Sequence, residues 1–224
     1  MKKANVVFVH GLWADGSSWN AIIPTLLNEG YEVVSVQNPL TSLADDVAAT
    51  NRVLSRLKGP TILVGHSWGG FVITAAGNHP NVSGLVYVAA MAPDEGETLG
   101  ELSEKYPAPA SLHLSVEDGF VWLSKEGVQQ HFAADVPDSE SALIYSTQGP
   151  AALALFGDKV TKPAWKNKPS WYILAKNDHT INPELERIMA NRMGARLTEL
   201  ESSHVPMISQ PEAVLKVIRD AASS

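Results

Sequence analysis

The stretch VGHSWGG, residues 64–70, places a serine between glycines directly after a short apolar run, residues 61–63. Its inner five residues fit the pattern G-x-S-x-G, with Gly65 and Gly69 two positions on either side of Ser67. In a nucleophile elbow, a serine occupies a strained turn from a strand into a helix, and glycines allow the two elements to approach closely. The pentapeptide alone could arise by chance. Its place between a predicted strand and an apolar segment of helical character, residues 71–76, favours a nucleophilic Ser67.

The chain on either side of this stretch alternates between strand and helix patterns. Strands are predicted at residues 6–9, 31–36, 61–64, 85–89, 171–175 and 196–200, and helices lie between them. Ser42 and Asp45 form a predicted capping box, as do Ser209 and Glu212, while Asn182 is expected to cap a helix that starts at Pro183. This alternation predicts an α/β fold, with about six mostly parallel strands and helices on both faces of the sheet.

The alternation breaks between residues 93 and 163. This segment contains several prolines and short helical pieces that carry large apolar side chains, and it shows no strong strand pattern. A linker would be polar, so we expect a helical cap inserted into a single domain that spans residues 1–224.

Composition narrows the class of protein. The 224 residues are 45% hydrophobic and 18% charged, with a net charge of −7 and no cysteine. The negative charge argues against nucleic acid or an anionic membrane surface as a partner, and disulfide and thiolate chemistry are impossible. No apolar run approaches membrane-spanning length, and the run after the first lysines is too short for a signal peptide. We expect a soluble cytoplasmic protein that acts on a small molecule; no sequence feature demands an oligomer.

A nucleophilic serine needs a base, and the base needs an acid that orients it. Among seven histidines, His204 stands just after the last predicted strand, at the sheet edge where loops of parallel strands converge. Asp178 follows the preceding strand and gives the chain order Ser–acid–His that this architecture requires. Asp94, after the strand at 85–89, is the alternative acid, and we prefer Asp178. His179 beside it is expected to be a pocket or loop residue.

The oxyanion of an acyl-transfer intermediate needs two backbone N–H donors. Trp68, the residue after the serine, supplies one in the expected arrangement. The loop after the first strand, His10-Gly11-Leu12, should supply the other. Gly11 lets the backbone turn toward the serine, so Leu12 is the predicted second donor.

Four segments together resemble a known family: VFVHGLWADGSSW (7–19), VGHSWGG (64–70), ILAKNDHTI (173–181) and ESSHVPMISQPEAV (201–214). They are similar to the α/β-hydrolase superfamily, in particular its small branch of plant methylesterases, hydroxynitrile lyases and related bacterial esterases. The resemblance covers roughly residues 4–95 and 165–222 and implies the α/β-hydrolase fold with a helical cap. It also implies the triad Ser67, Asp178 and His204, with Leu12 and Trp68 as oxyanion donors.

Two departures from the family pattern bear on the reaction. Lyases of this branch typically carry threonine after the first histidine and lysine after the catalytic histidine. Here these positions are Gly11 and Val205, so the resemblance implies an esterase rather than a lyase. Family dehalogenases use an aspartate nucleophile, which Ser67 excludes.

The expected function is therefore hydrolysis of a small or medium carboxylic ester through an acyl-enzyme, with no cofactor and no metal. The alternatives are a lactonase, amidase or perhydrolase on the same triad, or a ligand receptor with little turnover. Candidate substrate-binding residues are the aromatic side chains near the elbow and in the cap, together with one histidine: Trp13, Trp122, Phe132, Phe156, Trp165 and His179.

Overall fold

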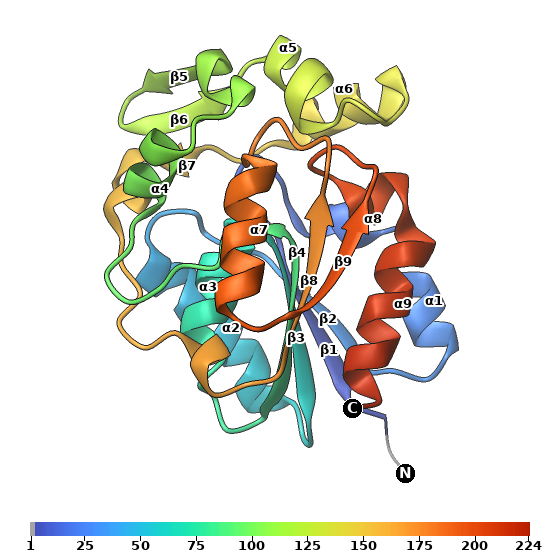
Figure 1. The fold of residues 1–224 in the computed structure, drawn as a ribbon. Helices are drawn as coiled ribbons and strands as arrows, with labels where there is room; N and C mark the ends of the chain where they lie inside the picture. Colours follow the sequence, from blue (N-terminus) through green and yellow to red (C-terminus); the bar gives the residue numbers. More distant parts are fainter. Residues whose placement is uncertain (1–2) are drawn as a thin grey trace.

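A computed structural model describes residues 3–224, so the first two residues of the expected domain lie outside the described residues. Six strands form one sheet in the order β2-β1-β3-β4-β8-β9, and every pairing in it is parallel (Figure 1). The strands are β1 (Asn5–Val9), β2 (Val33–Val36), β3 (Thr61–Ser67), β4 (Val82–Ala90), β8 (Ser170–Ala175) and β9 (Arg196–Leu200). The predicted six-stranded α/β fold is confirmed.

Helices cover both faces of this sheet. α1 and α9 lie on one side of it, and α2, α3 and α7 lie on the other (Figure 1). Their bounds are α1 (Ile23–Asn28), α2 (Leu43–Arg56), α3 (Gly69–Ala76), α7 (Pro183–Arg192), α8 (Pro206–Ser209) and α9 (Pro211–Ala222). Strands β1, β3 and β8 are buried along their whole length, as strands covered on both faces must be. None of the helices within residues 3–224 is long and apolar enough to cross a bilayer.

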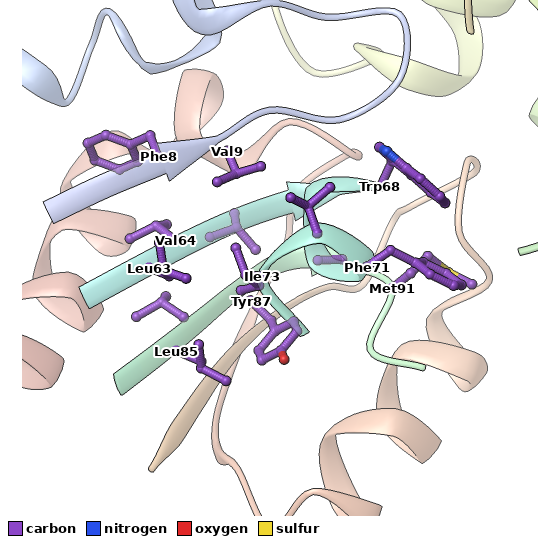
Figure 2. Close-up of a cluster of buried hydrophobic side chains, with 14 of the residues drawn as sticks. Phe8, Val9, Leu63, Val64, Trp68, Phe71, Ile73, Leu85, Tyr87 and Met91 are labelled. Atoms are coloured by element: carbon purple, nitrogen blue, oxygen red, sulfur yellow. The ribbon is translucent and has the colours of Figure 1, made fainter. Parts of the chain in front are cut away.

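The apolar core holds β3 and α3 together around the serine turn. Figure 2 shows Phe8, Val64, Phe71 and Ile73 within one buried cluster, and each of them is fully buried. The Trp68 ring stacks on Phe71 with ring centroids 4.9 Å apart. Burial of side chains of this size contributes roughly 1.5–3 kcal/mol each, so the turn between β3 and α3 is held by core packing.

The sequence predicted N-terminal capping residues for three helices, and the structure differs from this prediction most at α9. The Ser42 side chain accepts the N–H of Asp45, and the Asn182 side chain caps α7, as predicted. The second half of the capping box predicted at Ser42 does not form, because the Asp45 carboxylate accepts the hydroxyl groups of Thr41 and Ser42 instead of the Ser42 backbone N–H. The predicted capping box at Ser209 and Glu212 is wrong, because α9 begins after Gln210 with no side-chain cap. The chain first forms the short helix α8, which ends at Ser209.

Most of residues 93–163, which we call the cap segment, lies over the carboxyl ends of the parallel strands, and its last residues run back along α2 and α3 (Figure 1). The segment contains helices α4 (Leu99–Lys105), α5 (Lys125–Gly127) and α6 (Asp138–Thr147), as well as several short helical turns. It also carries an antiparallel sheet that the sequence analysis did not predict, formed by β5 (Leu114–Glu117), β6 (Phe120–Leu123) and β7 (Ala151–Ala152). Asp118 and Gly119 join β5 to β6 with φ values of 49° and 81°, and Asp-Gly is a strong hairpin signal.

Candidate active site

Ser67 is the last residue of β3, and α3 begins two residues later at Gly69. Its φ is 53°, in the left-handed region that non-glycine residues adopt at a cost. A Cβ on Gly65 would lie 2.6 Å from the Gly69 carbonyl oxygen, and a Cβ on Gly69 would lie 2.3 Å from that of Val9. Both glycines are therefore sterically required, and the turn has the strand–serine–helix geometry of an elbow.

The loop after β1 passes directly beside the serine. A Cβ on Gly11 would lie 2.6 Å from the Ser67 Cβ, so a side chain at this position would displace the turn. β1 pairs with β2 on one side and β3 on the other, which makes this edge the switch point where open α/β sheets bind ligands. Leu12 and Trp68 line the same pocket as Ser67.

His10 holds this loop in place, a role that the sequence analysis missed. Its Nδ1 lies 2.9 Å from the Gly11 carbonyl oxygen, and its Nε2 lies 2.9 Å from the backbone N–H of Asn38. Since Nε2 must accept from Asn38, the ring is neutral with its proton on Nδ1. Burial lowers the pKa of His10, which favours this neutral form. His10 thus fixes the loop through its two hydrogen bonds, and Gly11, which lacks a side chain, lets the loop approach Ser67 closely.

His204 and Asp178 form a buried pair. His204 Nδ1 lies 2.5 Å from Asp178 Oδ2, and neither side chain is exposed. The other oxygen, Oδ1, accepts the backbone N–H groups of Thr180 at 2.6 Å and Ile181 at 2.9 Å. His204 Nε2 is buried and has no hydrogen-bond partner among residues 3–224. Asp94, the alternative acid, instead pairs with Lys166 at the surface at 2.5 Å.

His66 places the His204 main chain against the serine turn. The His66 Nε2 lies 2.8 Å from the His204 carbonyl oxygen, and the two ring centroids are 4.6 Å apart. Phe132 from the cap segment packs edge-on against His204, with centroids 4.9 Å apart. Burial lowers the pKa of His66 well below its ordinary value, with a smaller contribution from His204, so His66 acts as a neutral donor. The structure therefore brings His204, the partner of Asp178, next to the residue that precedes Ser67.

A buried carboxyl group fixes the Trp68 side chain. Asp46 on α2 accepts the indole N–H of Trp68 at 2.8 Å and the backbone N–H of Leu40 at 2.8 Å. Burial raises the pKa of Asp46 to about 6, although both hydrogen bonds act in the opposite direction. The hydrogen bond between Trp68 and Asp46 thereby connects the serine turn to α2, in addition to α3, which follows the turn in the chain.

An apolar pocket opens above the elbow, with a cavity volume of about 90 Å³. Its floor carries Ser67, Trp68, Leu12 and Trp13, and none of the lining residues within 3–224 is charged. The remaining lining residues come from the end of β4, from the cap segment, from the loop after Asp178 and from α7: Met91, Leu99, Ser103, Tyr106, Ala108, Ala110, Ser111, Leu114, Phe156, Thr180, Ile181, Asn182 and Leu185. The lining therefore offers no charged side chain that could pair with a charged ligand.

The six pocket residues suggested by the sequence separate into two groups. Trp13 and Phe156 line the pocket, and the Trp13 indole also donates to the Val121 carbonyl oxygen of β6 at 3.0 Å. The other four lie elsewhere: Trp122 lines a separate groove, Phe132 packs on His204, the Trp165 indole donates to the Pro93 carbonyl oxygen, and His179 is exposed. The aliphatic lining was missed, because an apolar residue in a pocket has the same sequence pattern as one in the core.

Three histidines meet where the cap segment contacts the loop after β8. His131 Nε2 lies 3.2 Å from His113 Nε2, and His131 Nδ1 lies 3.4 Å from His179 Nδ1. Because His131 uses opposite ring nitrogens toward its two neighbours, the three rings do not converge on one point. Within residues 3–224, no three His, Asp or Glu side chains are arranged to hold a metal ion.

The strained serine turn, the buried histidine–aspartate pair and the pocket at the switch point lie at the carboxyl edge of a parallel α/β sheet. Residues 6–217 match the model of the alpha/beta hydrolase family, and the chain belongs to that family. It is similar to a pyrethroid hydrolase of Sphingobium wenxiniae (25% identity; 100% of this chain, 89% of the relative). It is also similar to methylesterase 8 of Arabidopsis thaliana (23% identity; 95% and 87%). The crystal structure of polyneuridine aldehyde esterase superposes with a TM-score of 0.85 at 22% identity, over 97% of this chain and 98% of that one.

Proposed function

We propose that the chain is a serine esterase that cleaves small, uncharged carboxylic esters through an acyl-enzyme. The observation that carries the proposal is the buried His204–Asp178 pair, whose free Nε2 atom belongs to a histidine packed against the serine turn. An ionised Asp178 accepts the Nδ1 proton of His204, which leaves Nε2 as a proton acceptor. Ser67, in its left-handed turn, is the nucleophile that this acceptor serves.

Acylation begins when His204 Nε2 takes the proton of Ser67 Oγ and Oγ bonds to the ester carbonyl carbon. The carbonyl oxygen becomes an oxyanion, for which the N–H groups of Leu12 and Trp68 are the proposed donors. One such donor contributes roughly 3–4 kcal/mol of transition-state stabilisation in measured cases. The bond from carbon to the alkoxy oxygen then breaks, and His204 gives its proton to the departing alcohol.

Deacylation repeats the sequence with water. His204 removes a proton from a water molecule whose oxygen attacks the acyl carbon, the bond to Ser67 Oγ breaks, and Oγ takes the proton back. Asp178 stays ionised throughout and stabilises the imidazolium that forms in each half-reaction.

The pocket supports the substrate class. Its apolar walls and uncharged lining favour an ester with an apolar acyl group, since a buried unpaired charge would be costly. Relatives that are named a pyrethroid hydrolase and a methylesterase agree with carboxylic ester chemistry. Gly11 and the buried Val205 stand where lyases of the branch carry threonine and lysine, which also favours hydrolysis.

Steady-state turnover of short p-nitrophenyl esters tests the proposal. We expect activity in the wild type and its loss in Ser67→Ala and His204→Ala, while Ser83→Ala, which changes an exposed serine of β4, keeps wild-type kcat. A parallel panel of lactones and amides separates esterase from lactonase or amidase. Tight binding of an ester without turnover would instead identify a receptor, and activity that survives Ser67→Ala would contradict the nucleophile.

A further inference from the structure

A second carboxyl group lies behind the proposed acid, where the mechanism above does not use it. Glu186 on α7 is fully buried. One of its oxygens, Oε2, receives only a long hydrogen bond of 3.4 Å from the Ala175 N–H at the end of β8. The other oxygen, Oε1, is buried and has no donor among residues 3–224. An ionised carboxylate in this position would be poorly compensated, because buried charges need several hydrogen bonds or an opposite charge.

Glu186 has two polar neighbours, and neither can donate a proton to it. Asp178 and the Tyr172 hydroxyl are close enough to affect the pKa of Glu186, and both Glu186 and Asp178 contact the backbone of Ala175. The Tyr172 hydroxyl already donates its only proton to the Ala90 carbonyl oxygen. Asp178 accepts N–H groups at both of its oxygens, from Thr180 and Ile181 at Oδ1 and from the paired imidazole at Oδ2. Such a donor set fixes Asp178 as the ionised partner.

Two adjacent buried carboxyl groups cannot both be ionised, so a proton must reside on one of them. Since both oxygens of Asp178 accept hydrogen bonds, the protonated group of the two is Glu186. Burial and the charge of Asp178 raise the pKa of the Glu186 carboxyl well above its usual range. Both arginines of α7 pair with other carboxylates, Arg187 with Glu199 and Arg192 with Glu97, so neither of these charges compensates the buried group.

We infer that Glu186 is a positioning residue, a neutral carboxylic acid whose O–H donates to Asp178 and holds that carboxylate toward His204. The inference rests on the proposed function, since it assigns a partner to the proposed acid. A neutral donor fills a lone pair of Asp178 without adding a second negative charge beside the imidazole. It holds the carboxylate in the plane that the Nδ1–H bond requires, and it does so from a helix rather than from the loop that carries Asp178.

Infrared difference spectroscopy at pH 7 tests the protonation state without any need for activity. We expect the wild type to show the C=O band of a protonated carboxylic acid, and Glu186→Gln to lack it, while Glu184→Gln, which changes an exposed residue of the same helix, retains it. Absence of the band in folded wild-type protein would overturn the inference, even if the protein proves to be an esterase. Presence of the band in a protein without esterase activity would leave the buried acid in place and count against the proposed function alone.

Kinetics test the positioning role. Glu186→Gln keeps a donor of the same shape, so we expect nearly wild-type kcat and an unchanged acid-limb midpoint in the pH profile of kcat/KM. Glu186→Met removes the donor, and we expect kcat to fall about tenfold to hundredfold at unchanged KM, the range for a hydrogen bond to a charged group. A large shift of the midpoint in Glu186→Gln would mean that an ionised group had been removed. Equal kcat in the Met variant and the wild type, with both folded by circular dichroism, would also contradict the inference.

Discussion

The substitution Asp178→Asn should remove most of the activity while leaving the fold intact, and the hydrogen bonds of Asp178 show why. Oδ1 accepts two backbone N–H groups, from Thr180 at 2.6 Å and Ile181 at 2.9 Å, so the single oxygen of an asparagine amide must take this position. The amide NH₂ then faces His204 Nδ1, which lies 2.5 Å from the present Oδ2. An NH₂ group cannot accept a proton, so Nδ1 becomes the acceptor and the proton moves to Nε2. His204 can then no longer take the proton of Ser67.

A wrong tautomer of this kind costs about 10⁴-fold in kcat in a characterised serine hydrolase, which corresponds to about 5.5 kcal/mol of activation free energy. We expect a loss of this size in kcat on a p-nitrophenyl ester, a KM within a few-fold of wild type, and a thermal midpoint close to wild type. Asp94→Asn, at the surface carboxyl paired with Lys166, should keep its activity. If Asp178→Asn retains more than a tenth of the wild-type kcat, or if Asp94→Asn loses it, the assignment of the acid is wrong.

Three further predictions follow from side chains around the elbow. Gly11→Ala places a Cβ 2.6 Å from the Ser67 Cβ, so we expect a cost of about 1–3 kcal/mol in urea unfolding and a strong loss of kcat; unchanged kcat would contradict the required close approach. The pKa of Asp46 is raised to about 6, so the fluorescence of Trp68 should titrate near that pH and the step should vanish in Asp46→Asn, whereas a step that persists must have another origin. Burial keeps His66 neutral, so its contribution to stability is present above its ordinary pKa of 6.5 and is lost as the pH falls below that value. The thermal midpoint should therefore fall less steeply between pH 7 and 5 in His66→Gln than in the wild type, and equal slopes would contradict this reasoning.

The strands of the parallel sheet could be predicted from the sequence because the local apolar pattern and the burial of these strands in the fold favour the same residues. The run at residues 61–64 is apolar and bounded by Gly59 and Pro60, and burial on both faces demands that composition. The hairpin in the cap segment was missed for the opposite reason, since most of β5 is exposed and carries no alternating pattern. Its signal was confined to two residues, Asp118 and Gly119.

The candidate site was predictable where backbone geometry restricts the residue type. Gly65 and Gly69 are forced by contacts below 3 Å, and the positions of Asp178 and His204 follow from the ends of strands. The supporting residues were not predictable, because they depend on contacts between segments far apart in the chain. His10 reaches Asn38, and Glu186 reaches Asp178 from a helix, and no local pattern identifies either contact.

The pocket lining was the least predictable part. Phe156 and Trp122 are both large aromatic residues of the cap segment, yet one faces the serine and the other lines a separate groove. Which side of a short strand or turn faces the core depends on how the cap segment packs, and that is a property of the whole fold.

Ser67 is the proposed nucleophile, activated by His204, and covalent labelling of the serine tests this role. The folded protein is incubated with a fluorophosphonate, its intact mass is measured, and the modified peptide is located by mass spectrometry. We predict one adduct, on Ser67, that forms rapidly in the wild type, slowly in His204→Ala and not at all in Ser67→Ala. An unmodified mass for folded wild-type protein, or an adduct on any other serine, would show that Ser67 is not the nucleophile.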